Sequence, residues 1–178
     1  MRIIGGKHKS RLLKRVDSNL TRETADMVRQ AVFNMLEQSV HGNVLDLYAG
    51  SGSYGLEAIS RGADIVYFID YQKKAIQTII ANLTSLRETE KAKVIQKDAI
   101  SFLNGVDFEF DYVFIDPPYD FRFDEQLFSL LKTKTSNDAY IVYESKKSLQ
   151  LPNEAEGFLK IKDKTYGIKR ISIYQKVK

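Results

Sequence analysis

A buried strand that ends in two prolines sets the architecture of this chain; it lies in the segment FDYVFIDPPYDF, residues 110–121. Residues 112–115 form a short apolar run of β-favouring side chains, which is typical of a strand covered on both faces. Pro117 and Pro118 cannot donate to a sheet, so the chain must leave the strand at Asp116 as a stiff loop. Ligands of open α/β sheets bind at this carboxyl edge. The segment therefore predicts a central strand that presents Asp116 to a ligand.

The four residues Asp116, Pro117, Pro118 and Tyr119 combine a carboxylate, a carbonyl on a stiffened backbone and an aromatic ring. Such a set can accept both hydrogens of an exocyclic amine of guanine, adenine or cytosine while the ring stacks on the base. Pulling the hydrogens out of plane would return the lone pair to nitrogen, which makes the amine a better nucleophile. An ordinary Asp-Pro turn is the alternative, and these residues alone leave it open.

A glycine turn follows residues 44–47, which predict a strand, and precedes a predicted helix. Gly50, Gly52 and Gly55 have G-x-G-x-x-G spacing. Asp70 ends the next predicted strand, twenty positions after Gly50, which is the separation expected of an acid that binds ribose hydroxyls. We therefore expect a nucleoside-containing cofactor here, rather than a glycine-rich connector.

A third strand at residues 92–98 ends in another acid, Asp98, at the same predicted sheet edge. Asp98 can bind an adenine amine there or cap a helix that begins at Ala99, and neither role excludes the other. The segment at residues 145–157 is loop-like. The other predicted elements are helices at 73–86 and 125–132, a strand at 138–145 and a hairpin that turns at Tyr166 and Gly167.

Length and composition favour one domain over residues 1–178, with a basic arm at 1–20 and a core at 21–178. There is no cysteine and only two histidines, so we expect neither disulfides nor a metal site. We find no signal peptide and no apolar run of about 18 residues that could span a bilayer. These features predict a soluble cytoplasmic protein with no membrane partner.

The net charge of +4 hides two basic ends around an acidic middle. Residues 1–15 and 160–178 each carry +6, which leaves −8 for the rest of the chain. This distribution predicts a polyanionic partner bound at the ends, although two solvated basic faces are the alternative.

The segment at residues 20–38 predicts a helix that starts after a cap at Thr21 or Thr24. Arg22 and Arg29 lie off its apolar stripe and are placed to reach a ligand. The stripe itself, which we expect to pack in the core, consists of Ala25, Val28, Ala31, Val32, Met35 and Leu36.

Four motifs, RIIGGKHKSRLLK, TRETADMVRQAVFNML, DLYAGSGSYGLEAISRG and FIDPPY, occur in an order that resembles the bacterial 16S ribosomal RNA guanine-N2 methyltransferase family. The likeness covers nearly the whole chain, although D-P-P-Y is shared more widely among enzymes that methylate exocyclic nitrogens. It implies an α/β, Rossmann-like class I methyltransferase fold, with a central, mostly parallel seven-stranded sheet flanked by helices and a small N-terminal basic β-hairpin arm. Glu23 stands where the family usually has proline, which bears on the path into the helix and on any contact by Arg22.

The resemblance further implies transfer of a methyl group from S-adenosyl-L-methionine to the 2-amino group of one guanine in 16S (small-subunit) ribosomal RNA. The catalytic and base-binding roles fall to Asp116, Pro117, Pro118 and Tyr119. The cofactor-binding residues are Asp46, Tyr48, Gly50, Gly52, Gly55, Asp70, Asp98 and Ala99. We assign RNA binding to Arg2, Lys7, Lys9, Arg11, Lys14, Arg15, Arg22 and Arg29.

Three other functions compete with this one. A DNA amino-methyltransferase acting on adenine or cytosine shares D-P-P-Y but generally has an added target-recognition region, for which this chain has no space. A nucleic-acid-binding module that merely retains the sheet would have no reason to keep Gly50, Gly52, Asp70 and Asp116. A small-molecule methyltransferase would have no use for the two cationic ends.

Overall fold

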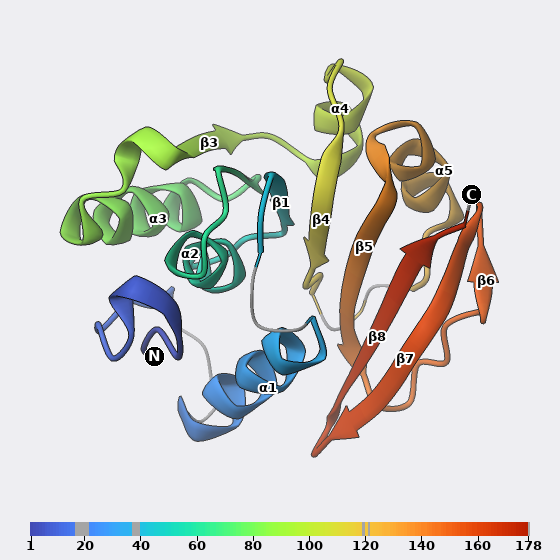
Figure 1. Cartoon of the computed structure of the whole chain (residues 1–178), viewed down its shortest axis with the longest axis horizontal. Helices are drawn as coiled ribbons and strands as arrows, with labels where there is room; N and C mark the ends of the chain where they lie inside the picture. The colour runs from blue at the N-terminus through green and yellow to red at the C-terminus, as the bar shows by residue number, and fades with distance from the viewer. Residues whose placement is uncertain (17–21, 37–39, 119, 121, 178) are drawn as a thin grey trace.

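An eight-stranded sheet forms the centre of the structure, a computed structural model that describes residues 1–16, 22–36, 40–118, 120 and 122–177. The strands lie in the order β3-β2-β1-β4-β5-β8-β7-β6 (Figure 1). The five parallel strands are β1 (Asn43–Leu47), β2 (Ile65–Asp70), β3 (Ala92–Gln96), β4 (Phe110–Ile115) and β5 (Thr135–Lys146). The antiparallel strands are β6 (Glu154–Ala155), β7 (Phe158–Tyr166) and β8 (Lys169–Lys176).

Five α-helices and two short 3-10 turns are described. The helices are α1 (Arg22–Met35), α2 (Ser53–Ser60), α3 (Lys73–Leu86), α4 (Ala99–Asn104) and α5 (Glu125–Thr133). The 3-10 turns are η1 (Gly6–His8) and η2 (Thr89–Lys91). These elements confirm the predicted Rossmann-like order of strands and helices. Of the two predicted caps of α1, Thr21 and the side chain of Thr24 lie outside the described residues.

Successive side chains of β4 enter two different apolar cores. Phe114 packs in the core formed with the N-terminal arm, α1, α2 and α3. Val113 and Ile115 pack in the core formed with α4 and α5. All three side chains are at most 1% exposed. This confirms the prediction of a central strand buried on both faces, and it explains why the run is continuously apolar rather than alternating.

The strand order reverses between β1 and β4, because β2 and β3 lie on one side of β1 and β5 lies beyond β4. The two strands pair in parallel with Leu47 opposite Ile115. The segments that follow these two residues therefore leave the sheet side by side. Such a switch point is where open α/β sheets bind their ligands.

The sheet has one strand more than the predicted seven. The extra strand is β6, a two-residue strand within the segment predicted as a loop. It pairs with Phe158 and Leu159 across a tight turn in which Glu156 and Gly157 have φ values of 50° and 83°. Two residues are too few to produce an alternating pattern, so only the pairing with the edge of β7 reveals this strand. The predicted hairpin at Tyr166 and Gly167 is confirmed by β7 and β8.

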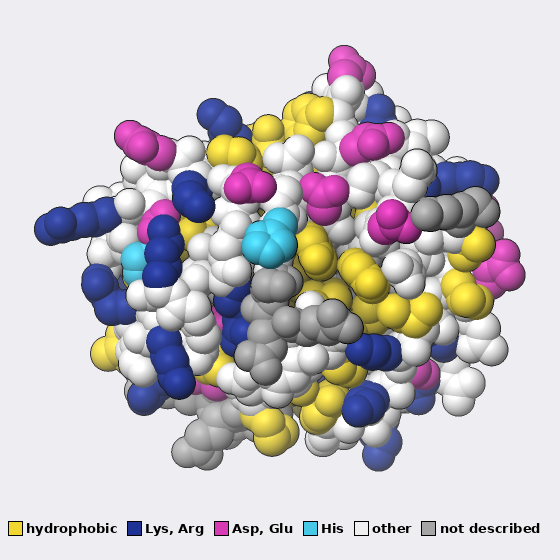
Figure 2. Space-filling view, in the orientation of Figure 1, with side chains coloured by type: hydrophobic (Ala, Val, Ile, Leu, Met, Phe, Trp, Pro, Cys, Tyr) yellow, Lys and Arg dark blue, Asp and Glu magenta, His cyan; other side chains and the backbone are white. Residues whose placement is uncertain are grey.

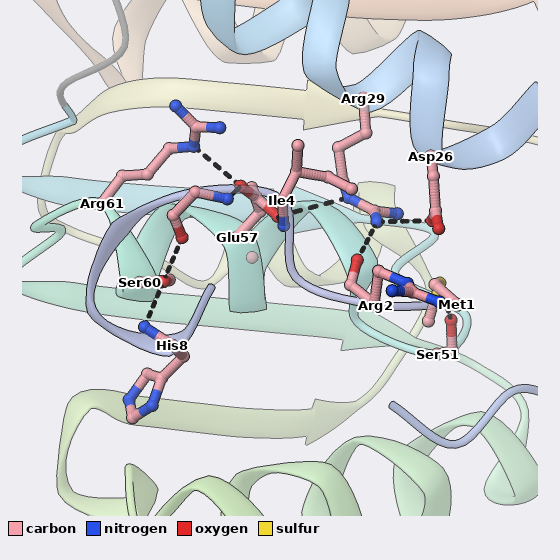
Figure 3. A network of polar contacts seen from close by, with 12 residues as sticks. Met1, Arg2, Ile4, His8, Asp26, Arg29, Ser51, Glu57, Ser60 and Arg61 are labelled. Carbon is pink, nitrogen blue, oxygen red and sulfur yellow. Dashed lines mark hydrogen bonds and ion pairs between the residues drawn. The ribbon is translucent and has the colours of Figure 1, made fainter. Parts of the chain in front are cut away.

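The N-terminal arm doubles back on itself but is held to the rest of the protein by a buried carboxylate. Arg2 and Leu12 form its one isolated antiparallel bridge. Glu57 of α2 is completely buried and accepts hydrogen bonds from the backbone amides of Ile4 and Gly5, each at 2.8 Å (Figure 3). The arm is therefore docked on α2 rather than extended.

Two arginines complete the surroundings of Glu57, as Figure 3 shows. The Arg61 guanidinium lies 2.8 Å from Oε1, and that of Arg29 lies 3.5 Å from Oε2. Arg29 also donates to Asp26 at 2.8 Å and to the carbonyl of Arg2 at 2.5 Å. A single carboxylate thus joins α1, α2 and the arm, because its two oxygens accept three hydrogen bonds and also form an ion pair with Arg29.

We expect Glu57→Gln to lower the free energy of unfolding by about 3 to 5 kcal/mol, because an amide cannot balance two buried guanidinium groups and its NH₂ group would face other donors. Urea denaturation of the purified protein measures this change. Glu90→Gln, at an exposed glutamate, is the matched control and should change stability by less than about 0.5 kcal/mol. Equal stability of the two variants would contradict the role given to Glu57.

Candidate active site

The glycine turn joins β1 to α2 at the switch point. Gly52 has a φ of 78°, a left-handed conformation that glycine adopts without strain. A Cβ atom on Gly55 would lie 2.2 Å from Cε1 of Phe68, so only glycine lets α2 approach β2 this closely. Tyr48 has a φ of 57° without being a glycine, which marks the start of the turn as strained. The backbone here is shaped by tight packing against the sheet.

Asp70 binds the backbone of the turn directly. Its Oδ2 accepts a hydrogen bond from the amide of Gly50 at 2.9 Å, and its Oδ1 accepts one from Gln72 at 2.9 Å. The side chain is 8% exposed. The structure thus brings Gly50 and Asp70 together across twenty positions of sequence. Each carboxylate oxygen has two lone pairs, so Asp70 keeps acceptor capacity beyond these two bonds.

Asp46 lies beneath the turn and is 2% exposed. Its Oδ2 accepts a hydrogen bond from the amide of Gly55 at 2.9 Å. Burial raises the pKa of this carboxyl from 3.8 to about 8; the Gly55 bond opposes the shift and the negative charge of Asp70 adds to it. Asp46 therefore supports the start of α2 from below rather than facing a cavity.

Asp98 and Ala99 lie at the end of the third strand, where α4 begins. The Asp98 carboxylate accepts a hydrogen bond from the amide of Ser101 at 2.9 Å. The Ser101 hydroxyl, and after it the Ser101 amide, hold the pKa of Asp98 below its usual value by hydrogen bonding. Ala99 is buried. Of the two roles that the sequence allows Asp98, the structure contains the helix cap. The contact with an adenine amine stays a prediction.

Asp116 leaves the sheet directly after β4 and lies in a cavity. The Asp116 residue is exposed to solvent within the cavity, and the other residues that line the cavity lie around it. Desolvation within the cavity, followed by the charge of Glu144, raises the pKa of its carboxyl well above the usual range, and Lys169 opposes the shift. Pro117 and Pro118 line the same cavity, whereas Tyr119 lies outside the described residues.

Two neighbouring cavities meet at this edge of the sheet. The first, on the side of the glycine turn, is lined by Tyr48, Gly50 and Asp116 among others. The second, on the side of β5, is lined by Asp116 with Pro117 and Pro118. We name them the glycine-turn cavity and the proline cavity. Gly52, Gly55, Asp46, Asp70 and Asp98 are not among the residues that line either one.

Three residues that the sequence did not single out belong to these cavities. Tyr54 donates a hydrogen bond to Glu144 at 2.7 Å, and the ammonium group of Lys169 contacts the other oxygen of Glu144. All three side chains are buried. Glu144 directly follows the apolar run of β5, and an acid at the carboxyl end of a predicted strand is a signal that could have identified it. Tyr54 and Lys169 carry no such signal.

The predicted RNA-binding cations divide into an exposed set and a buried one. Five arm residues are exposed, and Figure 2 shows Lys and Arg side chains gathered over the arm, on the left of the view. Arg15 lines the glycine-turn cavity. The exposed arm residues are Arg2, Lys7, Lys9, Arg11 and Lys14.

Arg29 requires a correction, and Arg22 cannot be placed. Arg29 is 3% exposed, and its guanidinium is bound to Asp26, Glu57 and the arm backbone instead of facing outward. Its position off the apolar stripe does not bring it to the surface, because the arm covers that face of α1. The side chain of Arg22 lies outside the described residues.

The described residues include no group of three or more His, Asp or Glu side chains placed to hold a metal ion. Within the same part of the chain, no helix combines the length and apolar character needed to cross a membrane.

A sheet of parallel strands with a glycine turn after β1, and with the antiparallel strand β8 beside β5, is the fold of the class I methyltransferases. The fold of N-methyltransferase NodS from Bradyrhizobium japonicum agrees, with a TM-score of 0.72 over 88% of this chain and 98% of that one at 9% identity. A solved Escherichia coli structure, described as "Putative methyltransferase yhhF", has a TM-score of 0.87 at 32% identity and covers 99% of this chain and 98% of that one.

The particular family follows from the sequence comparisons. The chain belongs to the family described as "Conserved hypothetical protein 95", whose model matches residues 1–175. It is 37% identical to ribosomal RNA small subunit methyltransferase D of Haemophilus influenzae, over 98% of this chain and 93% of that protein. The protein of the same name from E. coli K12 is 34% identical, over 99% of this chain and 90% of that one. This protein is thus a methyltransferase.

The raised pKa of Asp46 predicts a distinct pH dependence of stability. The unfolded chain loses this proton near pH 4, whereas the folded protein keeps it until about pH 8. Between about pH 4 and pH 8 the folded state therefore binds one more proton at Asp46 than the unfolded state does. As pH rises through this range, the contribution of Asp46 lowers the free energy of unfolding by at most about 1.4 kcal/mol per pH unit. Above about pH 8 the contribution is constant.

Asp46→Asn keeps an acceptor for the Gly55 amide and removes the titration. Its stability relative to the unaltered protein should therefore rise between pH 4 and pH 8 and then level off. Urea denaturation at several pH values measures the difference. Asp107→Asn, at an exposed aspartate, serves as the control and should follow the unaltered protein. If the Asp46→Asn and unaltered proteins depend on pH in parallel, the assignment is wrong.

Proposed function

We propose that this protein transfers a methyl group from S-adenosyl-L-methionine to the exocyclic 2-amino group of a guanine in 16S ribosomal RNA, acting in the cytoplasm on the small ribosomal subunit or its RNA. The observation that carries the proposal is the position of Asp116. Its side chain lines both the glycine-turn cavity and the proline cavity. A methyl donor held by the turn and a base held by the Asp-Pro-Pro segment would therefore meet at Asp116.

The groups that line the glycine-turn cavity, together with two aspartates outside it, fit this cofactor. Tyr48 and Gly50 line the cavity beside the first turn of α2. The remaining acceptor capacity of Asp70, next to Gly50, suits ribose hydroxyls, while the exposed Asp98 suits the adenine amine. When bound, S-adenosyl-L-methionine supplies an electrophilic methyl group on a positively charged sulfur.

The protein's own contribution to the reaction comes from Asp116 and the two prolines. The Asp116 carboxylate accepts hydrogen bonds from the target amine and stabilises the positive charge that develops on nitrogen. Pro117 and Pro118 have no N–H groups, so no backbone donor competes with the amine for the acceptors. No strong base is needed before transfer, because the proton leaves readily once nitrogen is alkylated. Because the amine must enter the proline cavity, we expect the guanine to be unstacked from its neighbours.

The names of the relatives support ribosomal RNA as the substrate. The two proteins from H. influenzae and E. coli are named for methylation of small-subunit ribosomal RNA, and each is matched over at least nine tenths of its length. The exposed cations of the arm supply the complementary charge for a phosphate backbone. A DNA amino-methyltransferase remains the second candidate, since D-P-P-Y would serve adenine or cytosine equally well.

Asp116→Ala should abolish methyl transfer while leaving cofactor binding nearly intact. Loss of one transition-state contact typically costs about 10²-fold to 10³-fold in turnover, and loss of base positioning adds to this. The measurement is single-turnover methylation of ribosomal RNA or small subunits, with the product nucleoside identified by mass spectrometry. Asp107→Ala, at an exposed aspartate, is the control and should keep full activity.

Two results would contradict this assignment. A near-normal rate for Asp116→Ala would remove the carboxylate from the mechanism. Methyladenosine or methylcytidine in place of 2-methylguanosine would overturn the choice of guanine and favour the second candidate.

Reversing two arm charges should weaken RNA binding and flatten its salt dependence. Lys9→Glu with Lys14→Glu should reduce the slope of log K against log salt by about one unit for each lost phosphate contact, with cofactor affinity unchanged. Lys93→Glu with Lys132→Glu makes the same change in net charge away from the arm. If both pairs have the same effect, the arm makes no specific contact with RNA.

A further inference from the structure

Asp116 and Glu144 occupy a position that no other described residue shares. They alone line both the glycine-turn cavity and the proline cavity. Asp116 directly follows β4, and Glu144 lies near the end of the adjacent strand β5. A second carboxylate therefore stands beside Asp116 where the two cavities meet.

Glu144 is held there by two donors from other parts of the fold. Its Oε2 accepts a hydrogen bond from the Tyr54 hydroxyl at 2.7 Å, and its Oε1 pairs with the ammonium group of Lys169. Glu144 is 4% exposed and Lys169 is 5% exposed. Burying two charges costs desolvation free energy, which their mutual attraction offsets only in part. An apolar pair at these two positions would avoid this cost.

Tyr54 ties this pair to the strand that carries Asp116. Its ring stacks on Phe114, two residues before Asp116, with ring centroids 5.1 Å apart and planes 12° apart. Burial and the charge of Glu144 raise the pKa of Tyr54 well above its usual value, so its hydroxyl stays protonated and donates. The side chains of Tyr54, Phe114, Glu144 and Lys169 thus form one connected group across α2, β4, β5 and β8.

We propose that Glu144 and Lys169 are positioning residues that set the ionisation of Asp116 for methyl transfer. The inference rests on the proposed function, because it assigns Asp116 to the target amine. Glu144 and Lys169 act through Asp116 and have opposite effects on it. Glu144 favours the protonated carboxyl by repulsion, and Lys169 favours the carboxylate by attraction.

Charged groups face Asp116 from each neighbouring element. Glu144 on β5 and Asp46 on β1 both raise the pKa of Asp116, in addition to desolvation, whereas Lys169 on β8 lowers it. Tyr54 on α2, Arg29 on α1 and Arg15 of the arm line the glycine-turn cavity, and Lys146 on β5 lines the proline cavity. Among the charged groups, Glu144 has the largest effect on the pKa of Asp116 and Lys169 has the next largest. These two groups therefore have the most influence on whether Asp116 is ionised.

Methyl transfer needs both of the opposite effects that Glu144 and Lys169 have on the ionisation of Asp116. As the bond from the methyl carbon to the amine nitrogen forms, the bond to sulfur breaks and its electron pair stays on sulfur. The methylated nitrogen then carries a positive charge and one surplus proton, which passes to the Asp116 carboxylate. Asp116 must therefore be ionised before transfer and basic enough to take the proton afterwards. Lys169 serves the first requirement and Glu144 the second.

The test is the pH dependence of single-turnover methylation at saturating cofactor and RNA. We expect Glu144→Gln to move the acidic limb of the profile to lower pH and Lys169→Met to move it to higher pH, each by about one to two units. Glu144→Gln combined with Lys169→Met should return the limb close to its original position. Lys169→Arg keeps the charge and should leave the limb in place.

A purely structural role would lower the rates without these opposed shifts. Limbs that do not move, or that move in the same direction in both single variants, would overturn the inference. If the unaltered enzyme methylates no guanine, the proposed function fails first, and the inference is then tested without substrate. Titration of the Asp116 carboxyl carbon by ¹³C NMR should show the same opposed shifts in the free protein. This measurement on Glu144→Gln and on the double variant also serves if Lys169→Met does not fold, and an unmoved titration in Glu144→Gln would overturn the inference.

Discussion

The site depends on hydrogen bonds from the backbone of the glycine turn to two aspartates. Gly55 donates to Asp46, and Gly50 donates to Asp70. These bonds tie the turn to β1 and β2 at the place where the strand order reverses. Since Gly55 allows a close approach that any Cβ would block, the turn and the sheet behave as one unit. The cofactor-side wall of the site is thus preorganised by the fold.

Carboxylates gather at this edge because parallel strands end there together. Three of these acids, Asp46, Asp70 and Glu144, lie on three different strands, and Asp116 directly follows a fourth. Like charges brought together in a partly dry region repel one another. Each buried acid has polar partners, which are backbone amides for Asp46 and Asp70 and a hydroxyl and an ammonium group for Glu144. Asp116 is the exception, since it faces a cavity and keeps its carboxyl available. The reactivity that we propose for Asp116 depends on the charged groups that surround it.

A second buried carboxylate, Glu57, connects the site to the surface that we propose for RNA. It holds the arm backbone on α2, whose first turn borders the glycine-turn cavity. The exposed arm cations therefore keep a defined position relative to the site, which suits recognition of one nucleotide within a large RNA. Arg29 takes part in this docking, and its side chain is buried. One cation is thereby used for architecture while its neighbours in the arm remain exposed.

The sequence by itself determined the order of the elements, the glycine turn and the Asp-Pro-Pro loop, because periodicity and turn chemistry are properties of neighbouring residues. It also indicated that Gly50 and Asp70 would meet, since their spacing matches one crossover. Only the tertiary structure decided that Glu144 pairs with Tyr54, ninety positions away, and with Lys169. It likewise decided that Arg29 is buried and that β6 exists. These features arise from contacts between distant segments, and the residues near each one in sequence do not encode its partner.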